Sequence, residues 1–335
     1  MRAVPISNPP NPWASTEVQY LEAPPEVRLE VFEDQTRSIL AKNDSPDVGF
    51  TYSVNPYRGC FHACAYCYAR PSHEYLSLGA GTDFDRKIFV KLHAPELLRA
   101  AFAKKDRQGK PTWQRDTVVF SGVTDCYQPL EASYRLTRRC LEVCVEAATP
   151  AGVITKAPLI ERDVDVLQAL AARCKTADSA GAHVTVSIPF WDEQNARAIE
   201  PYVATPRRRL RVIETLARAG IEVGVNVAPI IPGLNDQDIP KILSAARDAG
   251  ATHAGSVLLR LPGSVKAVFE ERVRAALPLS ADRVLHRIRE TRGGQLYDPR
   301  FGVRGRGEGT YALAIQTLFR TTARRLGFEH YGGEA

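Results

Sequence analysis

The chain has 335 residues, of which 44% are hydrophobic and 24% are charged, as in a globular protein with one large domain or two small ones. No apolar run approaches the ~20 residues of a membrane-spanning helix, and the first residues lack the apolar core of a signal peptide, so we expect a cytoplasmic protein without a membrane partner. The net charge of +6, with 34 of 44 basic residues being arginine, fits either a biased composition or a phosphate-binding surface.

Residues 1–49 are expected to form an N-terminal arm. The first 26 residues are rich in proline and asparagine, which is typical of a mobile or extended segment. Val27, Leu29 and Val31 then alternate with charged neighbours, a period of two that predicts a half-buried strand or an edge segment. A turn-forming stretch at residues 43–47 closes the arm.

A cysteine-rich loop follows an apolar, strand-like run at residues 50–54. Cys60, Cys64 and Cys67 have the spacing C-x-x-x-C-x-x-C, and thiolates this close together can bind one metal centre. A [4Fe–4S] cluster takes four protein thiolates in most proteins, so three would leave one iron for a ligand that is not protein. A structural zinc site, which needs four ligands, and inert thiols are the alternatives.

Apolar, β-rich runs recur after this loop, and their starting points, taken at residues 117, 153, 184, 221 and 255, are 31 to 37 residues apart. They occupy residues 117–120, 152–155, 183–188, 221–227 and 256–259, with helix-like stretches between them. A glycine that could end a helix precedes four of them: Gly152, Gly181, Gly220 and Gly250. Together with residues 50–54, they predict six βα units and a parallel sheet.

This α/β pattern favours a partial (β/α)6 TIM-like barrel over residues 50–262, and a doubly wound open sheet is the alternative. Residues 263–335 are expected to form a helical, arginine-rich cap packed on this core. Its last helix is predicted over Tyr311–Leu326, with apolar positions at Leu313, Ile315 and Leu318.

Polar residues collect where the predicted strands end. They include residues 121–125 after the second strand, Lys156 after the third, Ser187 on the fourth and Asn226 on the fifth. The carboxyl ends of parallel strands meet at one face, where α/β proteins bind their ligands. The sequence therefore predicts a binding face that includes the cysteine loop.

The cysteine spacing, with Tyr66 directly before the last cysteine, resembles that of the radical S-adenosylmethionine (radical SAM) superfamily. Residues 55–60 and 121–125 are similar to its uncharacterised branch near spore photoproduct lyase. The resemblance implies that Cys60, Cys64 and Cys67 hold a [4Fe–4S] cluster whose fourth iron binds S-adenosylmethionine. An electron donor such as flavodoxin or ferredoxin would drive cleavage to a 5′-deoxyadenosyl radical that abstracts hydrogen from a substrate.

The resemblance also implies roles for individual residues around the cofactor. Tyr66 would pack near the adenine, and the segment with Ser121, Gly122, Thr124 and Asp125 would contact the methionine amino group. Lys156 and Ser187 are candidates for binding the methionine carboxylate and the ribose. Arg197 is a second candidate for the carboxylate. Cys126 could return a hydrogen atom to a substrate radical, or be an inert buried thiol.

A nucleic-acid-binding or nucleic-acid repair protein with a structural metal cluster is the alternative function. Its basis is the arginine clustering at residues 207–211 and 283–306, which could bind phosphates or form solvated helix faces. Cys140 and Cys144 lie four residues apart on a predicted helix, where a second cluster or core packing are the options.

Overall fold

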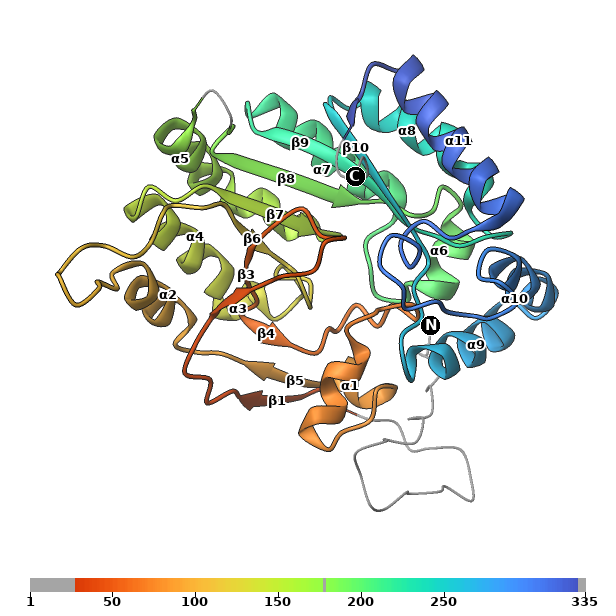
Figure 1. Cartoon of the computed structure of the whole chain (residues 1–335), viewed down its shortest axis with the longest axis horizontal. Coiled ribbons are helices and arrows are strands. Elements are labelled where there is room, and N and C mark those ends of the chain that lie inside the picture. Colours follow the sequence, from red (N-terminus) through yellow and green to blue (C-terminus); the bar gives the residue numbers. More distant parts are fainter. Residues whose placement is uncertain (1–27, 177–178, 331–335) are drawn as a thin grey trace.

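An eight-stranded sheet forms the centre of the computed structural model, which describes residues 28–176 and 179–330 (Figure 1). The strand order is β11-β10-β9-β8-β7-β6-β3-β2. Every neighbouring pair is parallel except β2–β3. The strands are β2 (Leu40–Lys42), β3 (Tyr52–Val54), β6 (Val118–Phe120), β7 (Ala151–Thr155), β8 (Ala182–Ser187), β9 (Glu222–Ile230), β10 (His253–Leu258) and β11 (Glu329–His330). The extended segment predicted for residues 1–26 lies outside the described residues.

The strand order separates the two predicted architectures. A doubly wound sheet reverses its order at a switch point, whereas β3, β6, β7, β8, β9 and β10 follow one another across this sheet in chain order. The order begins at β11 and ends at β2, so the sheet is open. The prediction of a partial (β/α)6 barrel is therefore confirmed.

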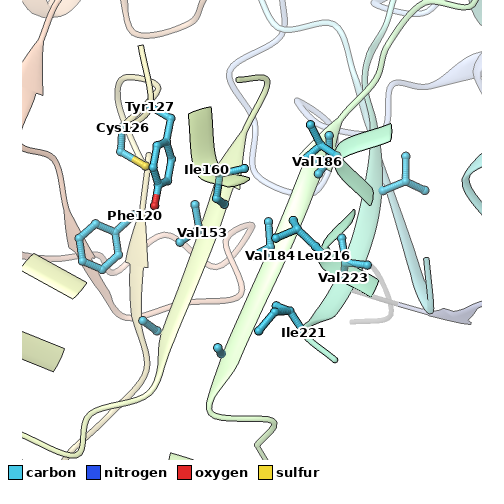
Figure 2. Close-up of a cluster of buried hydrophobic side chains, with 14 of the residues drawn as sticks. Phe120, Cys126, Tyr127, Val153, Ile160, Val184, Val186, Leu216, Ile221 and Val223 are labelled. Atoms are coloured by element: carbon cyan, nitrogen blue, oxygen red, sulfur yellow. The ribbon is translucent and has the colours of Figure 1, made fainter. Parts of the chain in front are cut away.

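The main core lies between this sheet and its helices. Figure 2 shows Phe120, Val153, Val184, Val186 and Val223 from four neighbouring strands in one buried cluster. β-Branched residues suit the pleated backbone, and strands covered on both faces read as continuous apolar runs. This is why the strands could be predicted from the sequence.

Helices cover the outer face of the sheet. Within this layer α4 packs against α2 and α5, and α8 packs against α11. Gly220 and Gly250 directly follow the C-caps of α7 and α8 at φ +75° and +101°, as predicted for residues that end a helix. Gly181 also has a positive φ, +78°, but it lies seven residues after α5 ends at Cys174, so it does not end that helix. Gly152 instead lies inside β7, and Ala148 takes the left-handed conformation there at φ +48°, so the prediction for Gly152 was wrong. The outer helices are α2 (Ala94–Phe102), α4 (Leu136–Glu146), α5 (Val164–Cys174), α7 (Pro206–Arg218), α8 (Ile239–Asp248) and α11 (Gly309–Arg325).

Helix α11 buries a different face from the predicted one. Leu313 and Leu318 are exposed, whereas Ile315 and Phe319 are buried in the main core. The buried face of α11 also includes the small residue Ala312. An expectation based on large aliphatic residues alone overlooked it.

A second hydrophobic core lies at the carboxyl end of the strands. It is formed largely by α6 (Glu193–Ile199), α9 (Val265–Ala276) and α10 (Ala281–Glu290), and it includes Cys64 and Tyr66 of the cysteine loop. The loop is therefore packed against the C-terminal helices.

A small sheet and several short helices complete the fold. The sheet consists of β1 (Glu30–Glu33), β5 (Lys87–Val90) and β4 (Tyr57–Arg58) in the order β1-β5-β4. In the part of the chain described, no helix combines the length and apolar character that spanning a bilayer requires. The short helices are η1 (Arg70–Leu76), α1 (Thr82–Arg86), α3 (Glu131–Tyr134), η2 (Pro158–Asp163) and η3 (Asp236–Asp238).

Candidate functional site

The three cysteines lie on one tight loop after β4. Cys60 and Cys64 are buried and Cys67 is half-buried, and all three are free thiols. The amide of Ala63 donates to the carbonyl of Cys60 at 3.2 Å, and the amide of Cys67 donates to that of Cys64 at 3.2 Å. These turns bring the three thiols of the predicted motif to one place.

The chemistry of this donor set fits an iron–sulfur cluster better than a single ion. Within the described residues, the three sulfurs are not all within 4.8 Å of one another, whereas ligands of one zinc ion lie roughly 3–4 Å apart. In a cluster each thiolate binds a different iron. Burial raises the pKa of all three thiols, that of Cys64 to about 12, so the thiolates that a metal needs would form as it binds.

Arg70 fixes the cysteine loop from inside the protein. Its side chain is fully buried and donates to the carbonyl of Cys64 from Nε at 3.1 Å and from Nη2 at 2.9 Å. Its Nη1 donates to the carbonyls of Ala80 and Gly81 at 2.9 and 3.0 Å. Nη2 also pairs with Asp85 at 2.8 Å. One side chain thus joins the loop to the start of α1.

Gln128 holds the same loop from the segment after β6. Its Oε1 accepts from the amide of Phe61 at 3.0 Å, and its Nε2 donates to the carbonyl of Gly59 at 3.1 Å. His62 Nδ1 lies 3.4 Å from Asp125 Oδ2. Burial lowers the pKa of His62, which favours the neutral imidazole.

Residues 121–125 lie against the cysteine loop, as the sequence predicted. The amide of Val123 donates to Asn55 Oδ1 at 2.8 Å, and the hydroxyl of Tyr68 donates to the carbonyl of Gly122 at 2.6 Å. Thr124 Oγ1 donates to the carbonyl of Tyr57 at 3.0 Å. The segment therefore forms a second wall beside the thiols.

Asp125 links this wall to the end of β7. Its carboxylate accepts from Thr155 Oγ1 at 2.7 Å and from the amide of Lys156 at 2.8 Å. Asp125 therefore positions Lys156. Burial acts to lower the pKa of Lys156, but Cys64, Glu200 and Asp125 outweigh it and raise the pKa, so the amine is a cation beside the loop.

Tyr66 and Lys156 belong to a charged network that the sequence only partly indicated. Lys156 Nζ lies 5.7 Å from the centre of the Tyr66 ring. The hydroxyl of Tyr66 donates to Glu200, which pairs with the buried guanidinium of Arg209. Arg209 Nη1 donates in turn to the carbonyl of Ser187 at 2.9 Å. Glu200 was missed, and Arg209 was named only as part of the arginine run at residues 207–211, because each resembles a surface residue of an amphipathic helix.

The arginine run at residues 207–211 divides by burial. Helix α7 begins at Pro206 behind Thr205, whose Oγ1 accepts from the amide of Arg208 at 3.3 Å. This start directs Arg209 inward with 1% exposure and leaves Arg207 exposed. Arg208 forms an ion pair with Glu161. The run is therefore no uniform basic face.

Arginines of the C-terminal region also have internal partners. Arg292 is buried and donates to the carbonyls of Leu259 and Val303, both at 2.7 Å. Arg304 pairs with Asp47 at 2.5 Å. The bond to Leu259 joins the C-terminal segment to the barrel, and the pair with Asp47 joins it to the N-terminal arm. Arg292 and Arg304 therefore have internal partners and do not belong to a free phosphate-binding cluster.

Two further predicted residues differ in burial. Arg197 is exposed on α6 and donates to the carbonyl of Pro201. Cys126 is buried in the main core beside Tyr127 (Figure 2), and burial raises its pKa well above the usual range. This position favours the inert thiol for Cys126. Cys140 and Cys144 lie in the same core, which favours packing over a second cluster.

Comparison with known proteins identifies the family. The family model "Radical SAM superfamily" matches residues 54–246, more than half of the chain. An uncharacterised protein of Mycobacterium tuberculosis H37Rv is 36% identical over 222 residues, covering 66% of this chain and 62% of that protein. An uncharacterised protein of Methanocaldococcus jannaschii is 28% identical over 188 residues, covering 56% of this chain and 63% of that protein.

A solved structure shows the same fold. Spore photoproduct lyase complexed with dinucleoside spore photoproduct superposes with a TM-score of 0.63 at 15% identity, covering 93% of this chain and 87% of that one. The chain spans less than two thirds of the length of the two uncharacterised relatives. On the family match, the chain belongs to the radical SAM superfamily.

Proposed function

We propose that this member of the radical SAM superfamily is an enzyme that binds a [4Fe–4S] cluster and S-adenosylmethionine and abstracts hydrogen from a substrate. The observation that carries the proposal is the set of three thiols on one loop, beside residues 121–125 and the cationic Lys156. When bound, the two cofactors supply a reductively generated 5′-deoxyadenosyl radical. The protein supplies position and shielding.

Cys60, Cys64 and Cys67 would hold three irons and leave one open for a ligand with both an amine and a carboxylate. Lys156 would bind the carboxylate, because a half-buried cation forms strong charge-assisted hydrogen bonds with it. The wall of residues 121–125 offers backbone carbonyls as acceptors for the amine, and Tyr66 an aromatic face. Arg209 pairs with the carboxylate of Glu200, so Glu200 is shared between two cations and would leave Lys156 able to bind a ligand carboxylate.

The second core would shield the site from water. Phe190, Ile231 and Leu261 are fully buried in the cluster that also contains Cys64 and Tyr66. An apolar surround protects a reactive radical from side reactions. The electron would come from a small reduced protein such as flavodoxin or ferredoxin, and we place the reaction in the cytoplasm, where thiols stay reduced. The internal partners of Arg209, Arg292 and Arg304 make a nucleic-acid substrate the weaker candidate.

Anaerobic reconstitution of the full-length protein tests the proposal. We expect about four irons per chain and 5′-deoxyadenosine that forms only when a reductant is present. Cys60→Ala, Cys64→Ala and Cys67→Ala should each abolish that product and lower the iron content. Cys174→Ala, a buried cysteine at the end of α5, is the matched control and should retain both. Product formation that persists in all three loop variants would exclude the proposed site.

A further inference from the structure

A second set of metal-ligating side chains lies at the opposite end of the sheet. His183, Glu222 and His253 stand at or next to the amino-terminal residues of β8, β9 and β10, which are neighbours in the sheet (Figure 1). His183 is in register with Glu222, and His253 with Gly224. Along β8, His183 is four residues from Ser187, or ~13 Å at ~3.3 Å per residue. The set is therefore separate from the cysteine loop.

The donor atoms of these three residues converge. They all lie within 4.8 Å of one another, and no other trio of His, Cys, Asp or Glu in residues 28–176 and 179–328 does so. Glu222 Oε1 is 3.4 Å from His183 Nδ1 and hydrogen-bonds His253 Nε2. Tetrahedral ligands at ~2.05 Å from a zinc ion are ~3.3 Å apart, so small side-chain movements would complete the geometry.

The surroundings of the trio support this geometry. His183 Nε2 is 3.0 Å from Thr185 Oγ1, a hydrogen bond that orients the ring with Nδ1 toward Glu222. Metal-binding histidines are commonly oriented in this way through the second nitrogen. Opposite His253, a Cβ on Gly224 would lie 3.1 Å from the carbonyl oxygen of His253 and 3.3 Å from its Cβ. Glycine at this position therefore lets β10 carry His253 close to the other two.

We propose that His183, Glu222 and His253 form a site for a divalent transition-metal ion, with zinc as its occupant. Two imidazoles and a carboxylate are ligands that zinc accepts, whereas magnesium and calcium prefer oxygen alone. The side chains of His183 and Glu222 are 26% and 28% exposed, so an ion can enter and water can fill the fourth position. The three protein ligands come from three neighbouring strands, so a bound ion would connect β8, β9 and β10 at this end of the sheet.

Zinc binding to the full-length, cluster-loaded protein tests this site. Calorimetric titration and metal analysis after desalting should show one zinc per chain in addition to the cluster iron, and no binding of magnesium. His183→Ala and Glu222→Gln should each weaken zinc binding at least about 10-fold while the iron content stays unchanged. His286→Ala is the matched control, since His286 also neighbours a glutamate, Glu290 at 3.6 Å, but on an exposed helix. It should bind zinc as the unchanged protein does.

Thermal unfolding provides a second readout. Zinc should raise the Tm of the unchanged protein, because an ion that binds only the folded state stabilises it, and should have no such effect on His183→Ala or Glu222→Gln. Circular dichroism should show that both variants are folded, since Glu222→Gln keeps the shape of the side chain and His183 is partly exposed. The proposal is overturned if no zinc binds, if both variants retain it, or if only Cys60→Ala abolishes zinc binding.

Discussion

The buried pair of Arg70 and Asp85 is the contact whose removal should disturb the cysteine loop most. Arg70 makes four hydrogen bonds to carbonyls of the loop and of the start of α1, besides its 2.8 Å ion pair with Asp85. In Arg70→Met the carboxylate stays buried without its partner. Breaking a buried pair from one side costs about 3–5 kcal/mol in the free energy of unfolding. We expect a loss of that size at pH 7, together with lower iron content after reconstitution.

The pH dependence of stability tests the same pair with a defined sign. Burial raises the pKa of Asp85 from 3.8 to about 6, although Arg70 acts to lower it. The folded state therefore binds the proton more tightly than the unfolded chain, and this group's contribution to the free energy of unfolding falls as the pH rises from about 4 to about 6. At about 1.4 kcal/mol per pKa unit, the fall is about 3 kcal/mol. Asp85→Asn has no carboxyl group to titrate and should not show this fall. The free energy of unfolding of the variant, relative to that of the unchanged protein, should therefore increase between about pH 4 and about pH 6.

Urea unfolding of the reduced, cluster-free full-length protein measures both effects. Arg99→Met is the matched control, because Arg99 forms a pair with Glu146 in which both side chains are more than half exposed. Such a pair is screened by water, and its loss should change the free energy of unfolding little. The reasoning is refuted if Arg70→Met loses no more stability than Arg99→Met, or if Asp85→Asn and the unchanged protein keep a constant difference from pH 4 to pH 6.

Two further predictions each compare a substitution in the site with a matched control elsewhere in the chain. Gly59 and Gly109 have φ of +77° and +81°, so alanine should cost about 1–2 kcal/mol at either from backbone strain alone. Gly59→Ala should cost ~1–3 kcal/mol more than Gly109→Ala because of crowding. A Cβ at Gly59 would lie 2.9 Å from the carbonyl oxygen of Phe84, whereas nothing lies within 4 Å of one at Gly109. Equal losses of the free energy of unfolding in urea would contradict this reasoning. Lys156→Met should weaken S-adenosylmethionine binding to the reconstituted protein about 10- to 100-fold, whereas the exposed Lys110→Met should not, and unchanged affinity in calorimetry would remove Lys156 from the site.

The fold could be predicted because its signals are local and repeated. Valine-rich runs such as those around Val184 and Val223 occur at a nearly constant spacing, and each predicted run became a strand in chain order. The errors arose where a signal depends on neighbours in space. Leu313 and Leu318 are apolar but face outward, since the position of α11 against α8 decides which side of the helix is buried. Gly152 could end a helix, yet it lies in β7 because Ala148 ends that helix first.

The candidate site was predictable only where its residues share a motif. Cys60, Cys64 and Cys67 stand on one short segment. The polar residues at the strand ends could be located once the strands themselves were predicted. Arg70 and Arg209 are the residues that hold the site, but a buried arginine and an exposed one look alike in a sequence. Only the folded chain shows that Arg70 donates to the carbonyl of Cys64.

The cysteine loop is held by partners from several parts of the chain, which bears on how it could bind a cluster. Cys60 donates its amide to the carbonyl of Phe84 in α1 at 3.1 Å, and Ala65 donates to that of Ile199 in α6 at 3.0 Å. Arg70 and Gln128 hold the loop at two more points. Ordering a free residue costs about 1–2 kcal/mol in backbone entropy. Because the loop is already ordered when the chain folds, binding a cluster would require little further loss of backbone entropy. The spacing of the cysteines thus predicts the ligands, whereas their readiness to bind depends on the whole barrel.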